Sequence, residues 1–75
     1  MPSGRVKWFN DKKKYGFIIK DDDGEDIFFH LKGISDPMLR NIISSDQNVT
    51  FTIMKDEKGQ RAVDVKLKLW KLRNG

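Results

Sequence analysis

The chain has 75 residues, with 15 lysines and arginines against 11 aspartates and glutamates, and a net charge of +4. A chain of this length forms one small domain around a single core, which excludes a two-domain enzyme or a large cofactor-binding fold. It has no cysteine and one histidine, so disulfides, thiolate metal clusters and metal sites built on histidines are excluded. No apolar run approaches the roughly 20 residues that span a bilayer. The first residues carry no signal-peptide core, so we expect a cytoplasmic protein without membrane contact.

The charges are distributed unevenly along the chain. Residues 5–20 carry six basic groups against Asp11, and residues 21–26 carry five acidic groups. Residues 66–75 add four basic groups and no acid. A local basic segment attracts polyanions even where the total charge is small. A solvated, balanced surface is the alternative, so charge alone does not decide the function.

Turn-forming residues separate five β-rich segments, which the pattern places at residues 5–10, 15–20, 26–31, 48–54 and 61–70. Short strands at this spacing predict an all-β chain, a small antiparallel barrel or sandwich. Closure into a barrel removes the strand edges that a small sheet cannot protect. After the third segment, Asp36 is placed to cap a short helical turn beginning at Pro37, which would close one end of the barrel.

The predicted strands differ in their two faces. Residues 48–54 and 62–69 alternate apolar with polar side chains, with Val63, Val65 and Leu67 on one face. Residues 15–19 and 26–31 are apolar or aromatic on both faces. Because a small barrel has one interior, these two strands should present rings outward, and such a patch usually marks a binding site. Six of the eight aromatic residues fall within residues 8–29, beside the basic segment: Trp8, Phe9, Tyr15, Phe17, Phe28 and Phe29.

Lysines interleaved with aromatic rings suit single-stranded nucleic acid. Each base offers a flat face, and stacking it on an aromatic ring contributes roughly 1–3 kcal/mol. Lysines meet the phosphates and release counterions. In the first strand, strict alternation places Lys7 with Phe9 and Trp8 with Val6. The first strand must therefore be bent or bulged if Lys7 and Trp8 both reach the ligand.

Three sequence blocks make the chain similar to a known family. Residues 6–10 (VKWFN), 13–18 (KKYGFI) and 26–31 (DIFFHL) resemble the bacterial cold-shock proteins, and the last two resemble the family's ribonucleoprotein motifs. The resemblance covers residues 4 to about 66 and is weaker over 32–48. It implies a five-stranded, antiparallel oligonucleotide-binding (OB) barrel that binds RNA and single-stranded DNA without catalysis. The implied role is an RNA chaperone or a regulator of transcription or translation.

The resemblance also implies roles for individual residues. Lys7 and Lys13 would meet phosphates or base edges, and Phe9 would lie at the edge of the aromatic patch. Arg61 stands near an amide contact of the family, where a cation would stack or bind phosphate. The side chains expected to stack on bases are Trp8, Tyr15, Phe17, Phe28 and His30.

The sequence departs from the family's pattern at several positions. Lys14 stands where the family has glycine, which adds charge and bears on the backbone entering the second strand. Leu31 replaces an aromatic residue that would be a stacking platform. The loop after the third strand has Met38 and Leu39 where the family carries another ring.

We divide the chain into a cold-shock domain at residues 1–66 and a basic extension at 67–75, which either continues the fifth strand or forms a tail. His30 has no partner for a metal site or for catalysis, so we expect no catalytic residue, no metal, no cofactor and no small-molecule substrate. The expected partners are single-stranded RNA and single-stranded DNA, bound by a monomer. Two alternatives remain: a small-barrel protein-interaction module using the same aromatic patch, and an RNA-recognition fold with two helices flanking a sheet.

Overall fold

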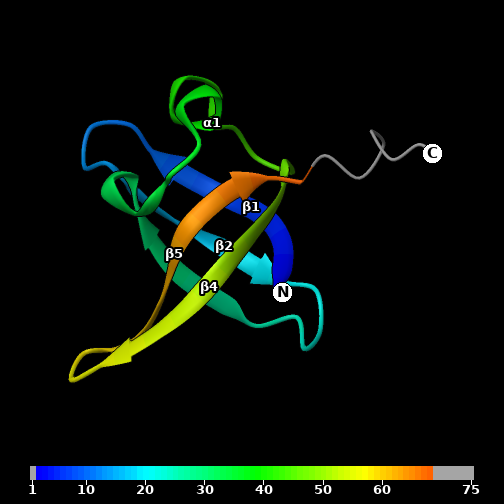
Figure 1. The fold of residues 1–75 in the computed structure, drawn as a ribbon, viewed down its shortest axis with the longest axis vertical. Coiled ribbons are helices and arrows are strands. Elements are labelled where there is room, and N and C mark those ends of the chain that lie inside the picture. The colour runs from blue at the N-terminus through cyan, green and yellow to red at the C-terminus, as the bar shows by residue number, and fades with distance from the viewer. Residues whose placement is uncertain (1, 69–75) are drawn as a thin grey trace.

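The computed structural model describes residues 2–68 of the chain (Figure 1). Within these residues the chain forms strands and two short helices close to the predicted segments. The single α-helical turn begins at Pro37, as the sequence predicts, and a further 3-10 turn follows the third strand. The elements are β1 (Ser3–Asn10), β2 (Tyr15–Lys20), β3 (Asp26–His30), η1 (Leu31–Gly33), α1 (Pro37–Ile42), β4 (Asn48–Asp56) and β5 (Gly59–Leu67).

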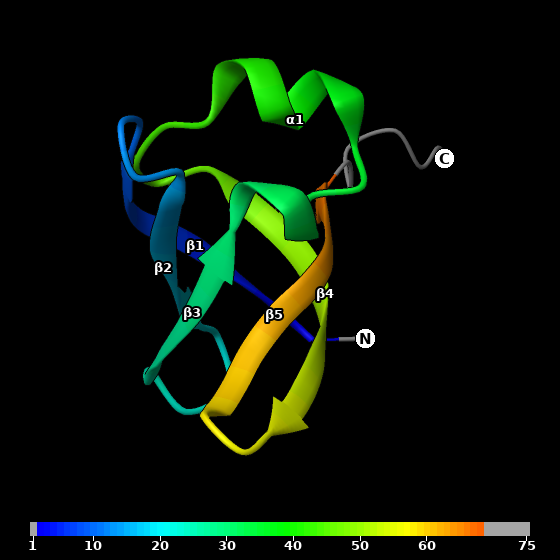
Figure 2. The same ribbon diagram turned by 90° about the vertical axis from the view of Figure 1, so that its left-hand side faces the viewer.

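The strands close into a barrel in the order β1-β2-β3-β5-β4, with β1 also paired to β4 (Figures 1 and 2). This confirms the five-stranded barrel expected from the sequence. All neighbours are antiparallel except β3 and β5, which pair in parallel at Phe28↔Arg61 and Phe29↔Ala62. The exception is geometric, because an odd number of strands cannot alternate direction all the way around a closed barrel.

A β-bulge in β1 confirms the predicted irregularity of the first strand. Val6 pairs with Ile18 and Trp8 pairs with Phe17, so Lys7 is an extra residue between two consecutive pairs. A bulge of this kind shifts the alternation of side chains by one residue. Val6 therefore points into the barrel, while both Lys7 and Trp8 reach the outer surface.

A second irregularity lies in β5 and changes the predicted face of one residue. Thr52 pairs with Val63 and Thr50 with Lys66, so β5 carries an extra residue opposite β4. Asp64 lies inside this bulge with a φ of 54°. The expectation that Val63 shares the inner face with Val65 is wrong. Val65 is fully buried, whereas Val63 is half-buried on the opposite side of the strand.

The core fills the barrel and its end beneath α1. The Asp36 Oδ1 atom accepts a hydrogen bond from the Met38 backbone N–H at 3.0 Å, as expected of the helix cap. Leu39 of α1 is buried, so the helix closes one end of the barrel (Figure 2). The buried apolar side chains are Val6, Ile18, Ile27, Phe29, Ile34, Leu39, Val49, Phe51, Ala62 and Val65.

The last described residues continue the fifth strand only briefly. β5 ends at Leu67, and the Lys68 N–H still donates to the Asn48 carbonyl at 2.9 Å. Trp70 and the rest of the proposed 67–75 extension beyond Lys68 lie outside the described residues. Within residues 2–68 there is no helix long and apolar enough to cross a membrane.

Candidate nucleic-acid interface

Aromatic rings gather on the outer surface of β1, β2 and β3. Tyr15 and His30 are directly opposite on neighbouring strands, and so are Phe17 and Phe28. Trp8 is 38% exposed, while the other four side chains are half-buried. We call this surface the aromatic face: it consists of Trp8, Tyr15, Phe17, Phe28 and His30.

The rings of the aromatic face hold one another in place. The centroid of Trp8 lies 5.8 Å from that of Tyr15 and 5.3 Å from that of Phe17, with interplanar angles of 61° and 57°. Phe28 lies 5.5 Å from Tyr15 and 5.9 Å from Phe17. These are tilted or edge-to-face contacts, which aromatic pairs prefer over face-to-face stacking. The rings therefore keep fixed orientations and are not hidden flat against one another.

A glycine allows β1 and β2 to approach beneath this surface. A Cβ atom on Gly16 would lie 2.1 Å from the Trp8 carbonyl oxygen and 2.9 Å from the Phe9 Cα atom. Both contacts are shorter than atoms tolerate, so a side chain at residue 16 would push β1 away. Gly16 thus positions Trp8 beside the rings of β2.

The His30 ring is fixed by the turn that follows it. Its Nδ1 atom accepts a hydrogen bond from the Lys32 backbone N–H at 3.0 Å, which caps η1. The Nε2 atom on the other side of the ring is not used in that bond. His30 is therefore held in one orientation beside Tyr15, and a ring with a fixed plane suits stacking.

Lys7 and Lys13 both lie near the aromatic face, with different partners. The Lys7 Nζ atom lies 2.9 Å from an Asp26 carboxylate oxygen, and both side chains are about half exposed. Lys13 is exposed in the β1–β2 turn, where its backbone N–H donates to the Asn10 side chain at 2.9 Å. Its ammonium group makes no ion pair within residues 2–68.

Arg61 extends the aromatic face across the barrel seam, because it is paired with Phe28 in the parallel β3–β5 contact. Its Nη1 atom forms an ion pair with Asp56, and its Nη2 atom lies 3.5 Å from the Met54 sulfur. Asp56 and Met54 therefore hold the guanidinium, and Arg61 and Phe28 line the same surface hollows.

Phe9, expected at the edge of the patch, lies instead behind the aromatic face. Its ring stacks on buried Phe29 with centroids 5.7 Å apart and an interplanar angle of 29°, and it packs against the core. The cause is the bulge at Lys7, because the shifted alternation that turns Trp8 outward turns Phe9 inward. Of the other predicted site residues, five form the aromatic face, Arg61 lines hollows with Phe28, and Lys7 and Lys13 lie close to Trp8 and Tyr15 along the chain.

Two surface hollows flank Phe28 and add residues that the sequence analysis did not single out. One, of about 380 Å³, includes His30, Lys32 and Arg61 along the seam of β3 and β5. The other, of about 340 Å³, is lined by Phe28, Lys58, Gln60 and Arg61. Lys32 is brought there by the local η1 turn after His30, whereas only barrel closure brings Lys58 of the β4–β5 turn beside Phe28.

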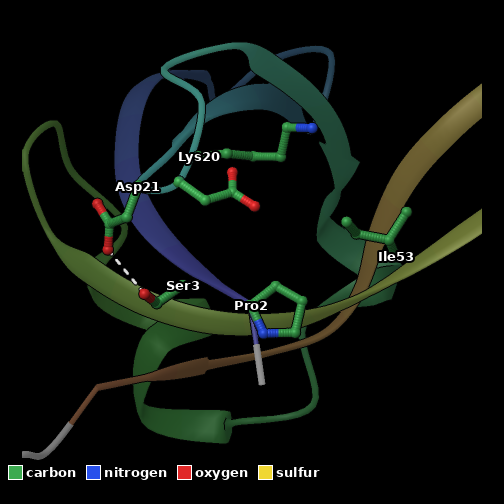
Figure 3. A pocket seen from close by; sticks show the side chains of 6 residues that line it. Pro2, Ser3, Lys20, Asp21 and Ile53 are labelled. Atoms are coloured by element: carbon green, nitrogen blue, oxygen red, sulfur yellow. Dashed lines mark hydrogen bonds between the residues drawn. The ribbon is translucent and has the colours of Figure 1, made fainter.

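A hollow of about 430 Å³ lies away from the aromatic face (Figure 3). Pro2, Ser3 and Ile53 line it together with the start of the acidic β2–β3 turn, and the Ser3 hydroxyl donates to Asp21 at 2.7 Å. Lys20, Asp21 and Asp22 complete its lining, with two carboxylates against one ammonium, so this hollow does not favour a polyanion. Within residues 2–68 no three His, Asp or Glu side chains are grouped to hold a metal ion.

A closed five-stranded barrel with rings and cations on its outer surface is typical of oligonucleotide-binding barrels. The family model described as "'Cold-shock' DNA-binding domain" matches residues 2–68. The chain therefore belongs to the cold-shock domain family, whose members bind nucleic acid.

Curated relatives agree with this assignment. The cold shock-like protein CspA of Vibrio cholerae is 40% identical over 63 residues, covering 84% of this chain and 89% of that protein. The cold shock protein ScoF of Streptomyces coelicolor is 42% identical over 65 residues, covering 87% and 96%. Among solved structures, one titled "drosophila Unr CSD456" matches with a TM-score of 0.76 at 19% identity, covering 97% of this chain and 29% of that one. That likeness supports the fold alone.

Proposed function

We propose that this protein binds single-stranded RNA and single-stranded DNA by stacking bases on the aromatic face, and that it acts as an RNA chaperone or regulator without catalysis. The observation that carries the proposal is that β1, β2 and β3 have apolar or aromatic side chains on both of their faces. Their inner side chains fill the core, while their outer side chains are partly exposed rings. Partly exposed rings gathered on one outer surface of a small domain usually mark a binding site, so a binding role explains why they lie outside the core.

Selectivity for single strands follows from which surface of the nucleic acid the rings need. A base contacts an aromatic ring through its flat face, and a duplex hides those faces within its stack. The aromatic face therefore favours unpaired segments, with modest sequence preference because every base has a flat face.

Cations beside the rings would meet the sugar–phosphate backbone. Lys13 has no competing carboxylate within residues 2–68, whereas Lys7 and Arg61 must share their charge with Asp26 and Asp56. The guanidinium of Arg61 is paired with Asp56, and Arg61 lines a hollow together with Phe28, so we assign it to stacking on a base and not to a phosphate. A monomer and a cytoplasmic location stay predictions.

Chaperone activity would need only mass action. A protein that binds the open form of an RNA and not its duplex stabilises the open form by RT ln(1 + [L]/Kd). At a free concentration of 100 times Kd this is about 2.7 kcal/mol per bound site, enough to open a marginal hairpin. No ATP and no catalytic group are involved.

The direct test is a tryptophan-fluorescence titration with a short oligothymidine and with the matching duplex, at two salt concentrations. The Trp70→Phe variant isolates the signal of Trp8. Quenching by the single strand alone, with a shallow salt dependence, is expected. Equal binding of the duplex with a steep salt slope would mean that the lysines form a general polyanion patch. No response to either ligand would favour the protein-interaction module.

Substitutions on β2 and β3 separate stacking from folding. Phe17→Ala and Phe28→Ala should each weaken oligothymidine binding by about 5- to 150-fold, the equivalent of 1–3 kcal/mol per stacked base. Both variants should stay folded. Phe29→Ala is the matched control, because that adjacent ring is fully buried and its removal should cost about 3–5 kcal/mol of unfolding free energy. Loss of folding by Phe17→Ala and Phe28→Ala to the same degree would refute an outward role for their rings.

A further inference from the structure

Two large apolar side chains of α1 are exposed to solvent. Met38 is 64% exposed and Ile42 is 49% exposed, whereas Leu39, next to Met38 in the sequence, is buried. Within residues 2–68 no other large apolar side chain is as exposed as Met38. Residues four apart lie on one face of a helix, about 6 Å apart along its axis. Met38 and Ile42 therefore form one small apolar surface, which we call the α1 patch.

A single carboxylate joins the start of α1 to the end of β5. The Asp36 Oδ1 atom accepts a hydrogen bond from the Met38 N–H, and the Asp36 Oδ2 atom accepts one from the Leu67 N–H at 3.2 Å. Figure 2 shows β5 ending at the same end of the molecule as α1. Because both N–H groups bond to one side chain, the chain leaves β5 beside the first turn of α1.

The residues that follow this point have a sequence with two different faces. Residues 69–75 (LWKLRNG) lie outside the described residues and beyond the family match at 2–68. In an extended chain, side chains two residues apart share a face and lie about 6.5 Å apart. An extended conformation would therefore place Trp70 and Leu72 on one face and the cations of Lys71 and Arg73 on the other.

The spacing of this apolar face matches that of the α1 patch. Trp70 and Leu72 would lie about 6.5 Å apart, close to the 6 Å or so between Met38 and Ile42 along the helix axis. Trp70 is three residues after Leu67, a span of about 10 Å when extended. That length is enough to bring the Trp70 ring to Met38, since Met38 and Leu67 start from the same carboxylate.

We propose that residues 69–75 dock on the α1 patch of the same chain, with the Trp70 ring on Met38 and Leu72 on Ile42. Lys71 and Arg73 then stay in water. An aromatic ring suits this place because the methionine sulfur makes favourable contacts with rings. Docking removes the α1 patch from water and adds a cover to the end of the barrel that α1 closes. This inference does not depend on the proposed function.

The small size of the α1 patch favours a segment of the same chain over a second copy. A stable interface between two proteins buries about 800 Å² on each partner, which two side chains cannot supply. Residues 69–75 are already joined to β5, so docking avoids the loss of translational freedom that association brings. A short link gives an effective concentration in the millimolar range, at which even a weak contact forms.

NMR of the full chain with ¹³C-methyl methionine tests the contact directly. The chain has three methionines, and Met54, exposed near the β4–β5 turn, is an internal control. Docking predicts nuclear Overhauser effects between the Trp70 ring protons and the Met38 methyl group. It also predicts a ring-current shift of the Met38 signal. Trp70→Ala should abolish both effects and leave the Met54 signal unchanged.

Acrylamide quenching of Trp70 gives an independent measurement. In Trp8→Phe, Trp70 is the one tryptophan that remains. In that background Met38→Ala should lower the equilibrium constant for docking about fivefold, the equivalent of about 1 kcal/mol of apolar contact, so quenching increases. Ile42→Ala should act in the same direction. Met54→Ala is the matched control, because it removes an exposed methionine outside the α1 patch and should leave quenching unchanged.

Three outcomes would overturn the proposal. The first is an absence of Trp70–Met38 Overhauser effects, with equal quenching of Trp70 before and after Met38→Ala. The second is a Met38 shift that disappears on dilution, which would assign the α1 patch to a second copy. The third is a Met38 shift that survives Trp70→Ala, which would exclude the docked ring as its cause. None of these results bears on single-strand binding, which the Phe17→Ala titration tests separately.

Discussion

Lys14 adopts a backbone conformation that its side chain disfavours. Its φ is 65°, in the left-handed region that costs a residue with a Cβ atom roughly 1–2 kcal/mol. Two hydrogen bonds hold it there: its N–H donates to the Asn10 carbonyl at 2.7 Å, and its carbonyl accepts from the Leu31 N–H at 2.8 Å. The family's glycine at this position fits the turn without strain. Lysine therefore adds a positive charge here and also adds backbone strain.

Lys14→Gly should therefore raise the free energy of unfolding. The relief of strain exceeds the added entropy of glycine in the unfolded chain, and a net gain of about 0.5–1 kcal/mol is expected. Urea denaturation measures it. Lys13→Gly is the control, because Lys13 carries the same charge in the same turn without a positive φ. An equal change in both variants would show that charge, and not backbone strain, is the cause.

At the scale of an element, the β2–β3 turn joins acidic residues to one lysine. The Glu25 backbone N–H donates to the Asp23 carboxylate at 2.9 Å, and the Lys20 ammonium lies 3.1 Å from the same carboxylate group. The Glu25 hydrogen bond first, and Lys20 second, lower the pKa of Asp23. The hydrogen bond and charge of Asp23 in turn raise the pKa of Lys20.

These two pKa shifts define the pH range in which the Asp23–Lys20 contacts stabilise the turn. Because the pKa of Asp23 is lowered in the folded state, its contribution is present above its ordinary pKa of 3.8 and is lost as pH falls through the folded pKa. Because the pKa of Lys20 is raised, its contribution is present below 10.5 and is lost as pH rises through its folded pKa. The Asp23 side chain is 49% exposed and the Lys20 side chain is 15% exposed, and the solvent around Asp23 screens the pair and keeps the effect small.

An NMR titration of the Asp23 carboxyl group tests this account. In Lys20→Ala the pKa of Asp23 should move upward but stay below 3.8, because the larger cause, the Glu25 hydrogen bond, remains. Lys12→Ala, a lysine in another turn, should leave the titration unchanged. A complete return of the Asp23 pKa to its ordinary value in Lys20→Ala would contradict the order of causes.

At the scale of the whole molecule, an apolar side chain contributes most to stability when it lies inside the closed barrel. Ile18 is fully buried, whereas Ile53 is 36% exposed, although alternation along β4 places it on the same face as buried Phe51. Beyond Phe51, whose N–H donates to the Pro2 carbonyl at 3.0 Å, β4 pairs only with β5, so the β4–β5 hairpin extends past the closed part of the barrel (Figure 2). Ile53 lies in that part of β4 and lines the hollow of about 430 Å³ beside Pro2 and Ser3, so part of its side chain is open to solvent.

Replacing these two isoleucines by alanine should have unequal effects. Ile18→Ala should cost about 2–5 kcal/mol of unfolding free energy, a large part of the total for a small domain. Ile53→Ala should cost about 1 kcal/mol or less, because much of its surface is already in water. Thermal and urea unfolding of the two variants, side by side, measure the difference. Equal losses would mean that the hairpin packs as part of the core.

The predicted and observed structures agree where local chemistry decides the conformation. Alternating apolar residues indicated the strands, and Asp36 with Pro37 indicated α1, because capping and backbone propensity act over a few residues. Tyr15, Phe17 and Phe28 were predicted to face outward because both faces of β2 and β3 are apolar and a barrel has one interior. In the structure Tyr15 pairs with His30 and Phe17 with Phe28, so these side chains lie on one side of the sheet.

The sequence by itself determined the strands, the barrel and the aromatic residues of β2 and β3, because periodicity and motif spacing are properties of neighbouring residues. The tertiary structure alone decided the exact place and effect of the bulges. They turn Phe9 inward and Val63 away from the core, because bulges depend on the partner strand. It also decided that Lys32 and Lys58 border the hollows beside Phe28. These hollows form only when barrel closure brings β5 against β3, two segments far apart in the chain, which local sequence patterns do not encode.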